Sequence, residues 1–337
     1  MSTTNLVEFL CDPRAYPENP GSVDLVQTHI SWVFIGDRYV YKVKKPVDFG
    51  FLDFTTLEKR RFFTHEELRL NRRFSPDVYL DVIPISRHGD SFLLGDASKV
   101  VEYALKMKRI REDRMLFRLL LTGKVGPSDM ERVGRHLAQV YSAISSDEKS
   151  SSFGSLQVIS GNVKENFDQT HKYRGGPVTD TALTAIEDWS MSFIEENRIL
   201  FEQRVRDGHI KDCHGDLHLQ HICLEDEAIS IFDCIEFNER FRFGDVASDV
   251  AFLSMDCDYN GHSALGDAFV NAYIKASGDS TMYDILKFYK VYRAYVRAKV
   301  TSFMLDDQGL DAKTRTDAFH RAREYYELAY RYVRDED

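Results

Sequence analysis

The stretch CHGDLHLQHIC, residues 213–223, places six side chains that commonly bind metals or protons within eleven positions. Structural zinc sites use close cysteine or histidine pairs on separate turns. Here Gly215 interrupts any helix that would carry the histidines, and Cys213 and Cys223 stand ten positions apart. Zinc remains an alternative, but the spacing disfavours it. The simpler interpretation of all five cysteines is that they are small buried hydrophobic residues.

Spacing measured from Asp216 favours phosphoryl transfer instead. That chemistry uses a carboxylate to accept the proton of the attacking hydroxyl, together with further ligands for a divalent metal ion. His221 follows Asp216 by five residues and Asp233 follows it by seventeen. Residues 222–233 contain two apolar runs around an acidic turn, which predicts a hairpin that ends at Asp233. We therefore expect Asp216 to be the catalytic base and Asp233 to be a metal ligand.

Strand signals dominate the first third of the chain. Two β-rich runs flank a turn signal within residues 23–45, another hairpin is predicted within residues 78–96, and a further strand over residues 100–110. One helix is predicted among them, over residues 56–74. We expect a capping box at Thr55 and Glu58 to begin this helix and Ser75-Pro76 to end it.

This first part should supply a lysine for the nucleotide phosphates and a glutamate that orients the lysine. Strand alternation puts Lys42 and Lys44 on one face, and Lys42 lies deeper in its strand. We therefore prefer Lys42 and keep Lys44 as the alternative. On the predicted helix, Glu67 is preferred over Glu66.

From about residue 112 the pattern becomes helical. Helices are predicted over residues 129–144, 181–205 and 285–300, and residues 145–152 are expected to form a polar loop. The chain therefore predicts an α+β fold with two lobes. Residues 1–105 would form a small β-rich nucleotide-binding lobe with one key helix. Residues 106–337 would form a larger, mostly helical lobe that carries catalysis and acceptor binding.

The segments HGDLHLQHI, IFDCIEF and FGDVASDVAFL together resemble the aminoglycoside phosphotransferase and choline kinase-like superfamily. Its signature is HGDxxxxNI, followed by a metal-binding Asp and a GDxxxDLA-like helix. The segments VYKVKKP, FLDFTTLEKRR, ELRLNRR and CHGDLH resemble a bacterial subgroup that also occurs fused to an ATP-binding domain. The resemblance covers roughly residues 23–300. It implies a bilobal protein kinase-like fold, MgATP, and transfer of the γ-phosphoryl group to a small-molecule hydroxyl.

Two aspartates in GDVASDVAFL are expected to be structural. Asp245 can cap the helix that follows it. The resemblance implies that Asp249 hydrogen-bonds the backbone of the catalytic loop.

The sequence departs from this pattern at His221, which stands where the superfamily has a metal-binding Asn. Imidazole is a softer ligand than Mg²⁺ prefers. His221 could therefore bind a more tolerant ion such as Mn²⁺, or hydrogen-bond a phosphate or Asp216 while Asp233 holds the metal. A third possibility is a nucleotide-binding pseudokinase or regulatory module with little transfer activity.

The second departure is the absence of a GxGxxG motif before Lys42. The phosphates would then be held near residues 29–32, with Ser31 as a contact. The adenine edge would meet backbone groups of the connector at residues 106–108, centred on Met107. Protein kinase activity is a further alternative, but no activation segment or APE-like motif supports it.

A basic stripe offers a clue to the acceptor. Lys290, Arg293 and Arg297 fall on one side of the helix predicted over residues 285–300. These cations either pair with acids in the core or line an acceptor pocket, where Arg293 and Arg297 would bind an anionic group. The second interpretation predicts a neutral or anionic acceptor rather than a polycationic aminoglycoside. Asp256 and Asp258 could instead supply an acidic pocket. His218 is either structural or faces the acceptor.

Composition excludes several classes of protein. Lys and Arg number 44 and Asp and Glu 54, for a net charge of −10, which disfavours general nucleic-acid binding. No apolar run approaches the length of a membrane span, and the N-terminus lacks a signal-peptide layout. An odd number of cysteines without a CxxC pair fits reduced thiols, so we expect a cytoplasmic location. The sequence does not determine an oligomeric state.

Overall fold

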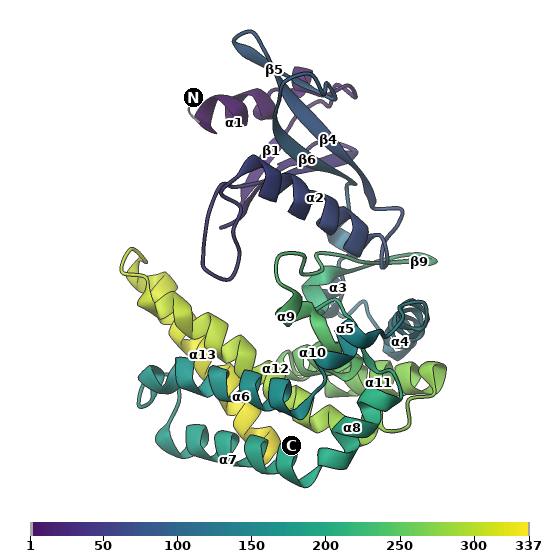
Figure 1. Ribbon diagram of the computed structural model, residues 1–337, viewed down its shortest axis with the longest axis vertical. Coiled ribbons are helices and arrows are strands. Elements are labelled where there is room, and N and C mark those ends of the chain that lie inside the picture. Colours follow the sequence, from purple (N-terminus) through teal and green to yellow (C-terminus); the bar gives the residue numbers. More distant parts are fainter. Residues whose placement is uncertain (1–2, 336–337) are drawn as a thin grey trace. The chain divides into compact units, whose positions relative to one another are not determined.

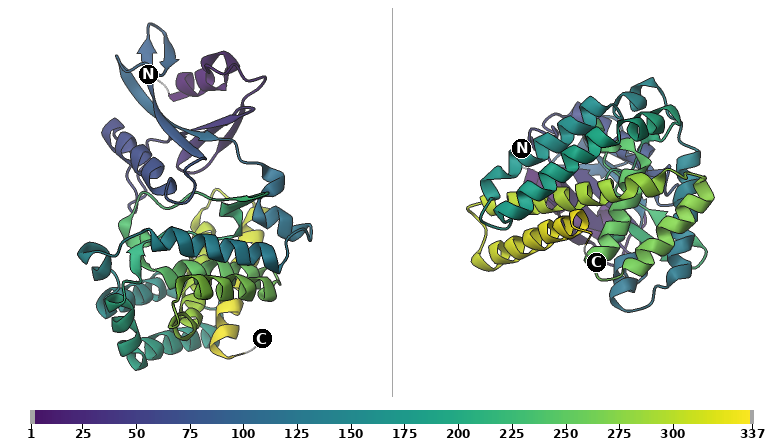
Figure 2. Two further views of the ribbon diagram at one scale, coloured as in Figure 1. Left: turned by 90° about the vertical axis from the view of Figure 1, so that its right-hand side faces the viewer. Right: turned by 90° about the horizontal axis from the view of Figure 1, so that it is seen from below.

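The computed structural model of the chain describes residues 3–335. It divides into two compact units, each described separately below (Figures 1 and 2). Unit 1 extends to Thr122 and also contains Gln220–Glu239, whereas unit 2 contains Gly123–Leu219 and resumes at Arg240. The architecture is of the predicted α+β class. The division at residue 105/106 stays a prediction, because these units have other boundaries and unit 1 includes a segment from far along the chain.

Unit 1 is built on a six-stranded antiparallel sheet in the order β1-β2-β3-β6-β4-β5. Its strands confirm the hairpins and the strand predicted within residues 23–45, 78–96 and 100–110. Their bounds are Asp24–Gln27 (β1), Ser31–Ile35 (β2), Tyr39–Lys44 (β3), Tyr79–His88 (β4), Ser91–Leu94 (β5) and Val100–Lys108 (β6).

The two faces of this sheet are covered by different helices because side chains alternate along each strand. Helix α1 (Thr3–Cys11) packs Leu6 and Leu10 with Ala104 on one face. Helix α2 (Leu57–Asn71) packs Leu68 with Leu105 on the other face. Adjacent residues of β6 thus enter separate hydrophobic clusters, and α2 is held against the face that carries the site described below.

Helix α2 confirms the predicted helix, but its cap differs. The N-cap is Thr56, whose hydroxyl accepts a hydrogen bond from the Lys59 backbone at 3.2 Å. The expected capping box at Thr55 is wrong, because Thr55 instead donates its backbone and hydroxyl hydrogens to Asp53. The helix ends at Asn71, with Arg72 as its C-cap, before Ser75-Pro76.

Unit 1 is completed by a short helix and the second hairpin. Helix α3 (Leu116–Leu121) contacts β8 (Ile222–Glu225), which pairs with β9 (Ala228–Ile231). This confirms the hairpin predicted within residues 222–233. The Ser75 hydroxyl donates a hydrogen bond to the Ile231 carbonyl at 2.7 Å, which ties the hairpin to the segment after α2.

Unit 2 is mainly helical. Helix α12 packs against α10 and α13, and α4 packs against α11. A Cβ atom on Gly134 of α4 would lie 2.4 Å from the Phe269 carbonyl oxygen of α11, so only glycine permits this close approach. The helices are α4 (Pro127–Ser142), α5 (Glu148–Ser152), α6 (Leu156–Thr170), α7 (Asp180–Glu196), α8 (Arg198–Arg206), α10 (Val246–Tyr259), α11 (Ser263–Ser277), α12 (Met282–Phe303) and α13 (Ala312–Val333).

A two-stranded sheet lies among these helices. It pairs β7 (Ile210–Asp212) with β10 (Phe243–Asp245), which follows the short helix α9 (Glu239–Arg242). Single 3₁₀ turns occupy Pro13–Ala15, Glu112–Arg114, His171–Tyr173, Leu219–His221 and Met304–Asp306.

Two local predictions for unit 2 are wrong. The polar segment 145–152 contains α5, because Asp147 and Ser150 form a capping box that starts a helix there. The long helix predicted over residues 181–205 is interrupted at Asn197, which separates α7 from α8. Helices α4 and α12 confirm the helices predicted over residues 129–144 and 285–300.

Candidate functional site

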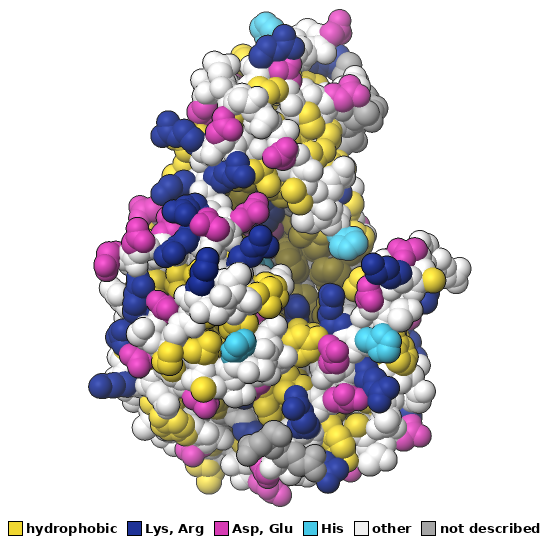
Figure 3. All heavy atoms as spheres, turned by 180° about the vertical axis from the view of Figure 1, so that it is seen from behind, with side chains coloured by type: hydrophobic (Ala, Val, Ile, Leu, Met, Phe, Trp, Pro, Cys, Tyr) yellow, Lys and Arg dark blue, Asp and Glu magenta, His cyan; other side chains and the backbone are white. Residues whose placement is uncertain are grey.

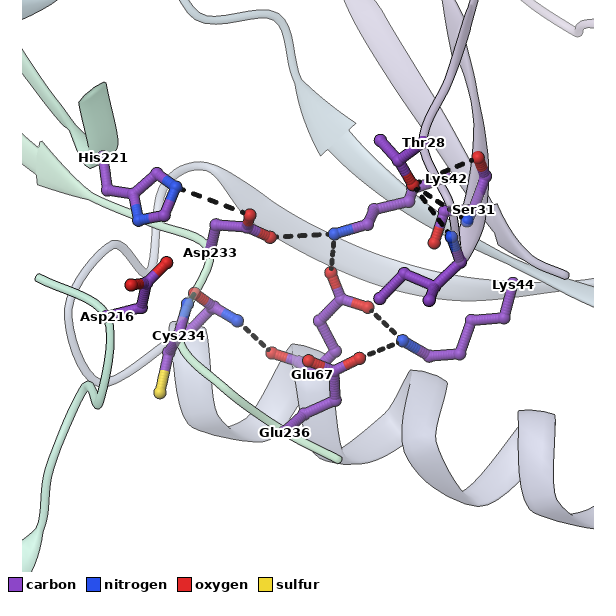
Figure 4. A network of polar contacts seen from close by, with 12 residues as sticks. Thr28, Ser31, Lys42, Lys44, Glu67, Asp216, His221, Asp233, Cys234 and Glu236 are labelled. Atoms are coloured by element: carbon purple, nitrogen blue, oxygen red, sulfur yellow. Dashed lines mark hydrogen bonds and ion pairs between the residues drawn. The ribbon is translucent and has the colours of Figure 1, made fainter. Parts of the chain in front are cut away.

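Lys42 of β3, Glu67 of α2 and Asp233 after β9 meet in unit 1, although 191 residues separate Lys42 from Asp233 (Figure 4). The Lys42 ammonium lies 2.8 Å from Glu67 Oε1 and 2.8 Å from Asp233 Oδ1. The Glu67 side chain is buried, whereas that of Asp233 is 48% exposed. The lysine and glutamate preferred from the sequence therefore form an ion pair, and one of the two predicted metal ligands contacts the same ammonium.

A second lysine shares the Glu67 carboxylate. Lys44 donates to Glu67 Oε2 at 2.7 Å and also contacts Glu236 Oε1. Lys44, Glu67 and Glu236 are all buried. Glu67 thus bridges two ammonium groups, each of which has a second carboxylate partner.

Electrostatics in this cluster reflect competition between burial and pairing. Burial disfavours the charged form of Lys42, but the carboxylates of Asp233 and Glu67 outweigh it and raise the pKa of Lys42 well above its ordinary value. Burial also opposes ionisation of Glu67, and the two lysines outweigh it, which lowers the pKa of Glu67. Burial dominates at Glu236 and raises its pKa despite Lys44. The pKa of Lys44 is raised as well, so Lys42, Lys44 and Glu67 stay charged at neutral pH.

The backbone at Asp233 adopts φ +64°, a left-handed conformation that aspartate tolerates better than most residues. Its N–H donates to the Tyr79 hydroxyl at 3.0 Å, and the next N–H, of Cys234, donates to Asn71 Oδ1 at 2.9 Å. Asn71 in turn donates to the Glu67 carbonyl at 2.9 Å. The same helix turn therefore positions Glu67 and the segment that carries Asp233.

His221 stands beside the other Asp233 oxygen. Its Nε2 lies 3.7 Å from Asp233 Oδ2 (Figure 4). A divalent ion held by Asp233 through Oδ2 would therefore have an imidazole nearby. The carboxylate suits Mg²⁺, which keeps several waters and uses few protein ligands, whereas the imidazole suits softer ions such as Mn²⁺. The Asp233 carboxylate and the His221 imidazole therefore fit a divalent cation that accepts a nitrogen ligand as well as oxygen ligands.

The remaining nucleotide contacts expected in unit 1 are less defined. Ser31 is fully buried, and its hydroxyl has no hydrogen-bond partner within residues 3–335. Its N–H donates to the Thr28 hydroxyl at 2.9 Å. Met107 is half-buried in β6, where it pairs with Val40 and Tyr79. The expected roles of Ser31 and Met107 stay predictions.

In unit 2, Asp216 follows a sharply turned loop. Gly215 adopts φ +87°, which explains a glycine before the proposed base. The N–H groups of His214 and Gly215 donate to Asp249 at 2.8 and 3.1 Å, respectively. This confirms the role expected for Asp249, which also accepts from the Tyr141 hydroxyl. Asp245 caps α10 by accepting from the Ala247 N–H at 2.9 Å, as predicted.

His218 points back toward Asp216. It is buried, and its Nε2 lies 3.4 Å from Asp216 Oδ2. The next residue, Leu219, donates its N–H to Asp256 Oδ2 at 2.9 Å. Burial raises the pKa of Asp256 above its ordinary value, although the Leu219 N–H, His218 and Arg297 oppose that shift. These contacts orient His218 within the loop, and its acceptor role stays a prediction.

The basic stripe of α12 is largely engaged within unit 2. Lys290 forms an ion pair with Asp258 at 2.9 Å. Arg293 donates to the Gly215 carbonyl at 2.9 Å and lies 3.4 Å from Asp249 Oδ1. Arg297 lies over the rings of Phe252 and Tyr325. For Lys290 and Arg293, these contacts favour the alternative in which the cations pair within the core. Acceptor contacts by Arg293 and Arg297 stay predictions.

The cysteines behave as packing residues. Within residues 3–335 no cysteine forms a disulfide; Cys213, Cys223, Cys234 and Cys257 are buried, and Cys11 is half-buried. Burial raises the pKa of the Cys223 thiol to about 11, as expected for a thiol packed among apolar residues. Cys213 donates to the Gly244 carbonyl at 3.3 Å.

Three side chains of the unit 1 site were not singled out from the sequence. Glu236 pairs with Lys44, Tyr79 accepts from the Asp233 N–H, and Asn71 accepts from the Cys234 N–H. The only local signal was an acid between apolar residues in IFDCIEF. Such a position predicts a buried charge only when a partner is known.

Comparison with known proteins yields relatives of unestablished function. No protein-family model matches the sequence. Uncharacterized proteins of Mycobacterium bovis and Mycobacterium tuberculosis are 30% identical over 290 residues, which is 86% of this chain and 56% of theirs. The chain thus spans about half the length of the curated relatives it matches.

Solved structures resemble the whole chain at low sequence identity. A GDP complex of aminoglycoside 2'-phosphotransferase-IIIa has a TM-score of 0.57 at 11% identity, covering 96% of this chain and 99% of that one. A choline/ethanolamine kinase family protein of Mesorhizobium loti has a TM-score of 0.55 at 11% identity, covering 98% and 99%. The choline kinase of Cryptosporidium parvum has a TM-score of 0.55 at 9% identity, covering 98% and 94%. The chain therefore has the bilobal fold shared by aminoglycoside phosphotransferases and choline/ethanolamine kinases, which confirms the fold that the sequence resemblance implied.

Proposed function

We propose that this protein is an ATP-dependent phosphotransferase that moves the γ-phosphoryl group to the hydroxyl of a small-molecule acceptor. The observation that carries the proposal is the contact of one ammonium group, on Lys42, with both Glu67 and Asp233 at 2.8 Å. Phosphoryl transfer needs a lysine for the phosphates, an acid that orients it and an acid for the metal ion. The fold shared with small-molecule kinases supports the same reaction class.

Each residue of the proposed site has a defined task. Lys42 would bind the nucleotide phosphates, and Glu67, itself fixed by Lys44, would hold that ammonium in place. Asp233 would bind a divalent cation, which neutralises phosphate charge when bound. Nucleotide binding then requires Lys42 to exchange part of its contact with Asp233 for phosphate oxygens. The paired state seen in unit 1 is accordingly the form that receives the nucleotide.

Asp216 would act as the base. The acceptor oxygen attacks the γ-phosphorus while the bond from that phosphorus to the β–γ bridging oxygen breaks. The hydroxyl proton passes to a carboxylate oxygen of Asp216, and ADP leaves with the bridging oxygen. Asp249 holds the two N–H groups before Asp216, so the base is presented from a backbone that has little freedom to reorient.

A variant of Asp216 tests the proposal. Purified protein is incubated with ATP or GTP, with Mg²⁺ or Mn²⁺, and with a panel of neutral, anionic and cationic alcohols. Asp216→Asn should keep nucleotide affinity and lower transfer by about 100-fold or more, as expected for a lost general base. Asp168→Asn is the matched control, because Asp168 is an exposed aspartate of α6 in the same unit. Unchanged transfer by Asp216→Asn would remove Asp216 as the base.

His221 motivates the second candidate, a nucleotide-binding module with little transfer activity. Its imidazole lies beside Asp233, where the related motif has an amide oxygen. Thermal shifts of wild type and His221→Asn with ATP and either metal separate the two functions. Nucleotide binding by wild type without transfer to any acceptor, and without slow ATP hydrolysis, would favour the second candidate. Two results together would favour an active enzyme adapted to its histidine. Wild type would transfer the phosphoryl group faster with Mn²⁺ than with Mg²⁺, and His221→Asn would transfer it faster with Mg²⁺ than wild type does.

The acceptor is proposed to be neutral or anionic. With Lys290 paired and Arg293 bound to the loop backbone, Arg297 is the cation of the stripe that rests on aromatic rings rather than on an acid. Robust transfer to aminoglycosides, with none to acidic or sugar-like alcohols, would reject this acceptor class. We also propose a cytoplasmic location, which the free buried thiols support. No helix within residues 3–335 has the length and apolar character of a membrane span.

A further inference from the structure

A separate cavity of about 790 Å³ lies in unit 1 at the turn between β2 and β3 and the start of the connector after β6. Its lining carries five cations and three acids. The cations are Arg38, Lys108, Arg109, Arg111 and Arg118. The face drawn in Figure 3 carries both cations and acids, and the chain as a whole has a charge of −10. An excess of positive charge around a cavity is therefore a local feature of this protein.

Within residues 3–335, three of these cations have neither an acidic partner nor a side-chain hydrogen bond. Arg111 forms an ion pair with Asp113 at 2.7 Å, and Arg109 donates to the Gly36 carbonyl at 3.1 Å. Within residues 3–335, Arg38, Lys108 and Arg118 form no ion pair with a carboxylate, and all three are exposed. Their N–H donors are available to a ligand.

Even with its three acids, the lining of the cavity carries more positive than negative charge. Asp37 accepts the Gly21 N–H at 2.7 Å, Asp113 is paired with Arg111, and Glu112 is the third acid of the lining. Guanidinium groups bind phosphate oxygens through paired hydrogen bonds, and a lysine adds a point charge. The floor includes the half-buried side chains of Tyr39 and Leu80, and the Arg38 guanidinium lies 5.6 Å from the centre of the Tyr39 ring.

The cavity is distinct from the proposed nucleotide site. In β3 and β6, Tyr39 pairs with Lys108, whereas Val40 pairs with Met107. Directly paired residues share a face, and neighbours along a strand face opposite ways. Val40 lies two residues before Lys42 and shares its face. Tyr39 and Lys108 therefore lie on the opposite face of the sheet from Lys42 and Met107.

We propose that this cavity binds a small molecule that carries a phosphate or polyphosphate group. Its volume is within the range of small-molecule sites. The three unpaired cations match the several oxygens of such a group. The proposal does not depend on the function assigned to Lys42 and Asp216.

Calorimetric titration with inorganic tripolyphosphate, without divalent metal ions, tests the site. Wild type should bind, and the affinity should fall as ionic strength rises. Arg38→Ala combined with Lys108→Ala should weaken binding by about tenfold for each cation removed. Arg118→Ala, on the separate helix α3, should weaken binding by a similar factor. This single variant keeps the proposal testable if the double variant does not fold.

Two control proteins locate the bound ion. Arg61→Ala combined with Lys99→Ala removes one arginine and one lysine that are exposed in the same unit but do not line the cavity. This control should bind as wild type does. Lys42→Met removes the lysine of the proposed nucleotide site and should also retain tripolyphosphate binding.

The proposal is overturned by any of four results. These are no binding by wild type, unchanged binding by the cavity variants, equal loss in the Arg61 and Lys99 control, and loss of binding in Lys42→Met. Tighter binding of polyglutamate than of tripolyphosphate would instead identify a site for acidic polypeptide. Because the nucleotide site is tested by transfer activity and this one by metal-free binding, failure of either proposal is recognised separately.

Discussion

Removal of Lys44 should destabilise unit 1 much more than neutralisation of Glu67, although both side chains are buried in one cluster. Three carboxylates there, on Glu67, Asp233 and Glu236, face the ammonium groups of Lys42 and Lys44. The cluster therefore carries one excess negative charge when all its members are ionised. Glu67→Gln removes that excess and leaves Lys42 paired with Asp233 and Lys44 with Glu236. Lys44→Met doubles the excess and leaves buried Glu67 and Glu236 without their shared cation.

The expected magnitudes follow from this difference in charge. Breaking a buried pair by removal of one partner costs about 3–5 kcal/mol, and we expect Lys44→Met to fall in that range. Glu67→Gln keeps the shape and loses charge-assisted hydrogen bonds, for a cost of about 1–2 kcal/mol. With a urea slope of about 2 kcal/mol/M, Lys44→Met should lower the unfolding midpoint by about 2 M.

Tryptophan fluorescence can report unit 1 by itself. The chain has two tryptophans, Trp32 in β2 and Trp189 in α7. In a Trp189→Phe background, urea unfolding followed at Trp32 therefore monitors the sheet that carries Lys44. Lys45→Met is the matched control, because Lys45 is a half-buried neighbour that bonds Thr28 and Gln27 and no carboxylate, and it should change stability by less than about 1 kcal/mol. A midpoint for Lys44→Met that is equal to or higher than that for Glu67→Gln would refute the charge reasoning.

Three further predictions concern pH, the loop before Asp216 and the core of unit 2. Pairing lowers the pKa of Glu67, so its contribution to stability is present above the ordinary glutamate pKa of about 4.3 and is lost as pH falls through the folded value. When unfolding at Trp32 is followed as a function of pH, Glu67→Gln should therefore lose less stability toward acid pH than wild type does. An equal loss in the two proteins would contradict this. Asp249→Asn should speed amide exchange at His214 and Gly215 by about tenfold or more, because both N–H groups lose a charged acceptor, whereas equal exchange would show that other contacts hold the loop. Arg204→Met should lower the free energy of unfolding by about 3–5 kcal/mol, followed at Trp189, because the buried carboxylates of Asp245 and Asp279 lose their guanidinium partner; a loss below about 1 kcal/mol would show that they take up protons at little cost.

Much of the local structure follows from periodicity. β-rich runs between turn signals predicted the strands of the sheet in unit 1, start and stop signals predicted α2, and helical spacing predicted α4, because spacing reports which side of a helix faces the core. The predicted helix bounds were wrong where a single polar side chain decides where the helix begins or ends. Thr55 and Thr56 are both able to cap a helix, and only the bond that Asp53 makes with Thr55 leaves the cap to Thr56. Asn197 likewise interrupts a helical pattern that continues on both sides of it.

The sequence by itself supplied the candidate groups for the proposed phosphoryl transfer, since Lys42, Glu67, Asp216 and Asp233, and the glycine before Asp216, can be read from it in order. Only the tertiary structure decided which charges pair. Glu236 lies 192 residues from Lys44, and Arg293 lies 78 residues from the Gly215 carbonyl that it binds. A buried charge needs a partner wherever the chain can bring one, and the packing of elements, rather than local spacing, brings that partner into reach.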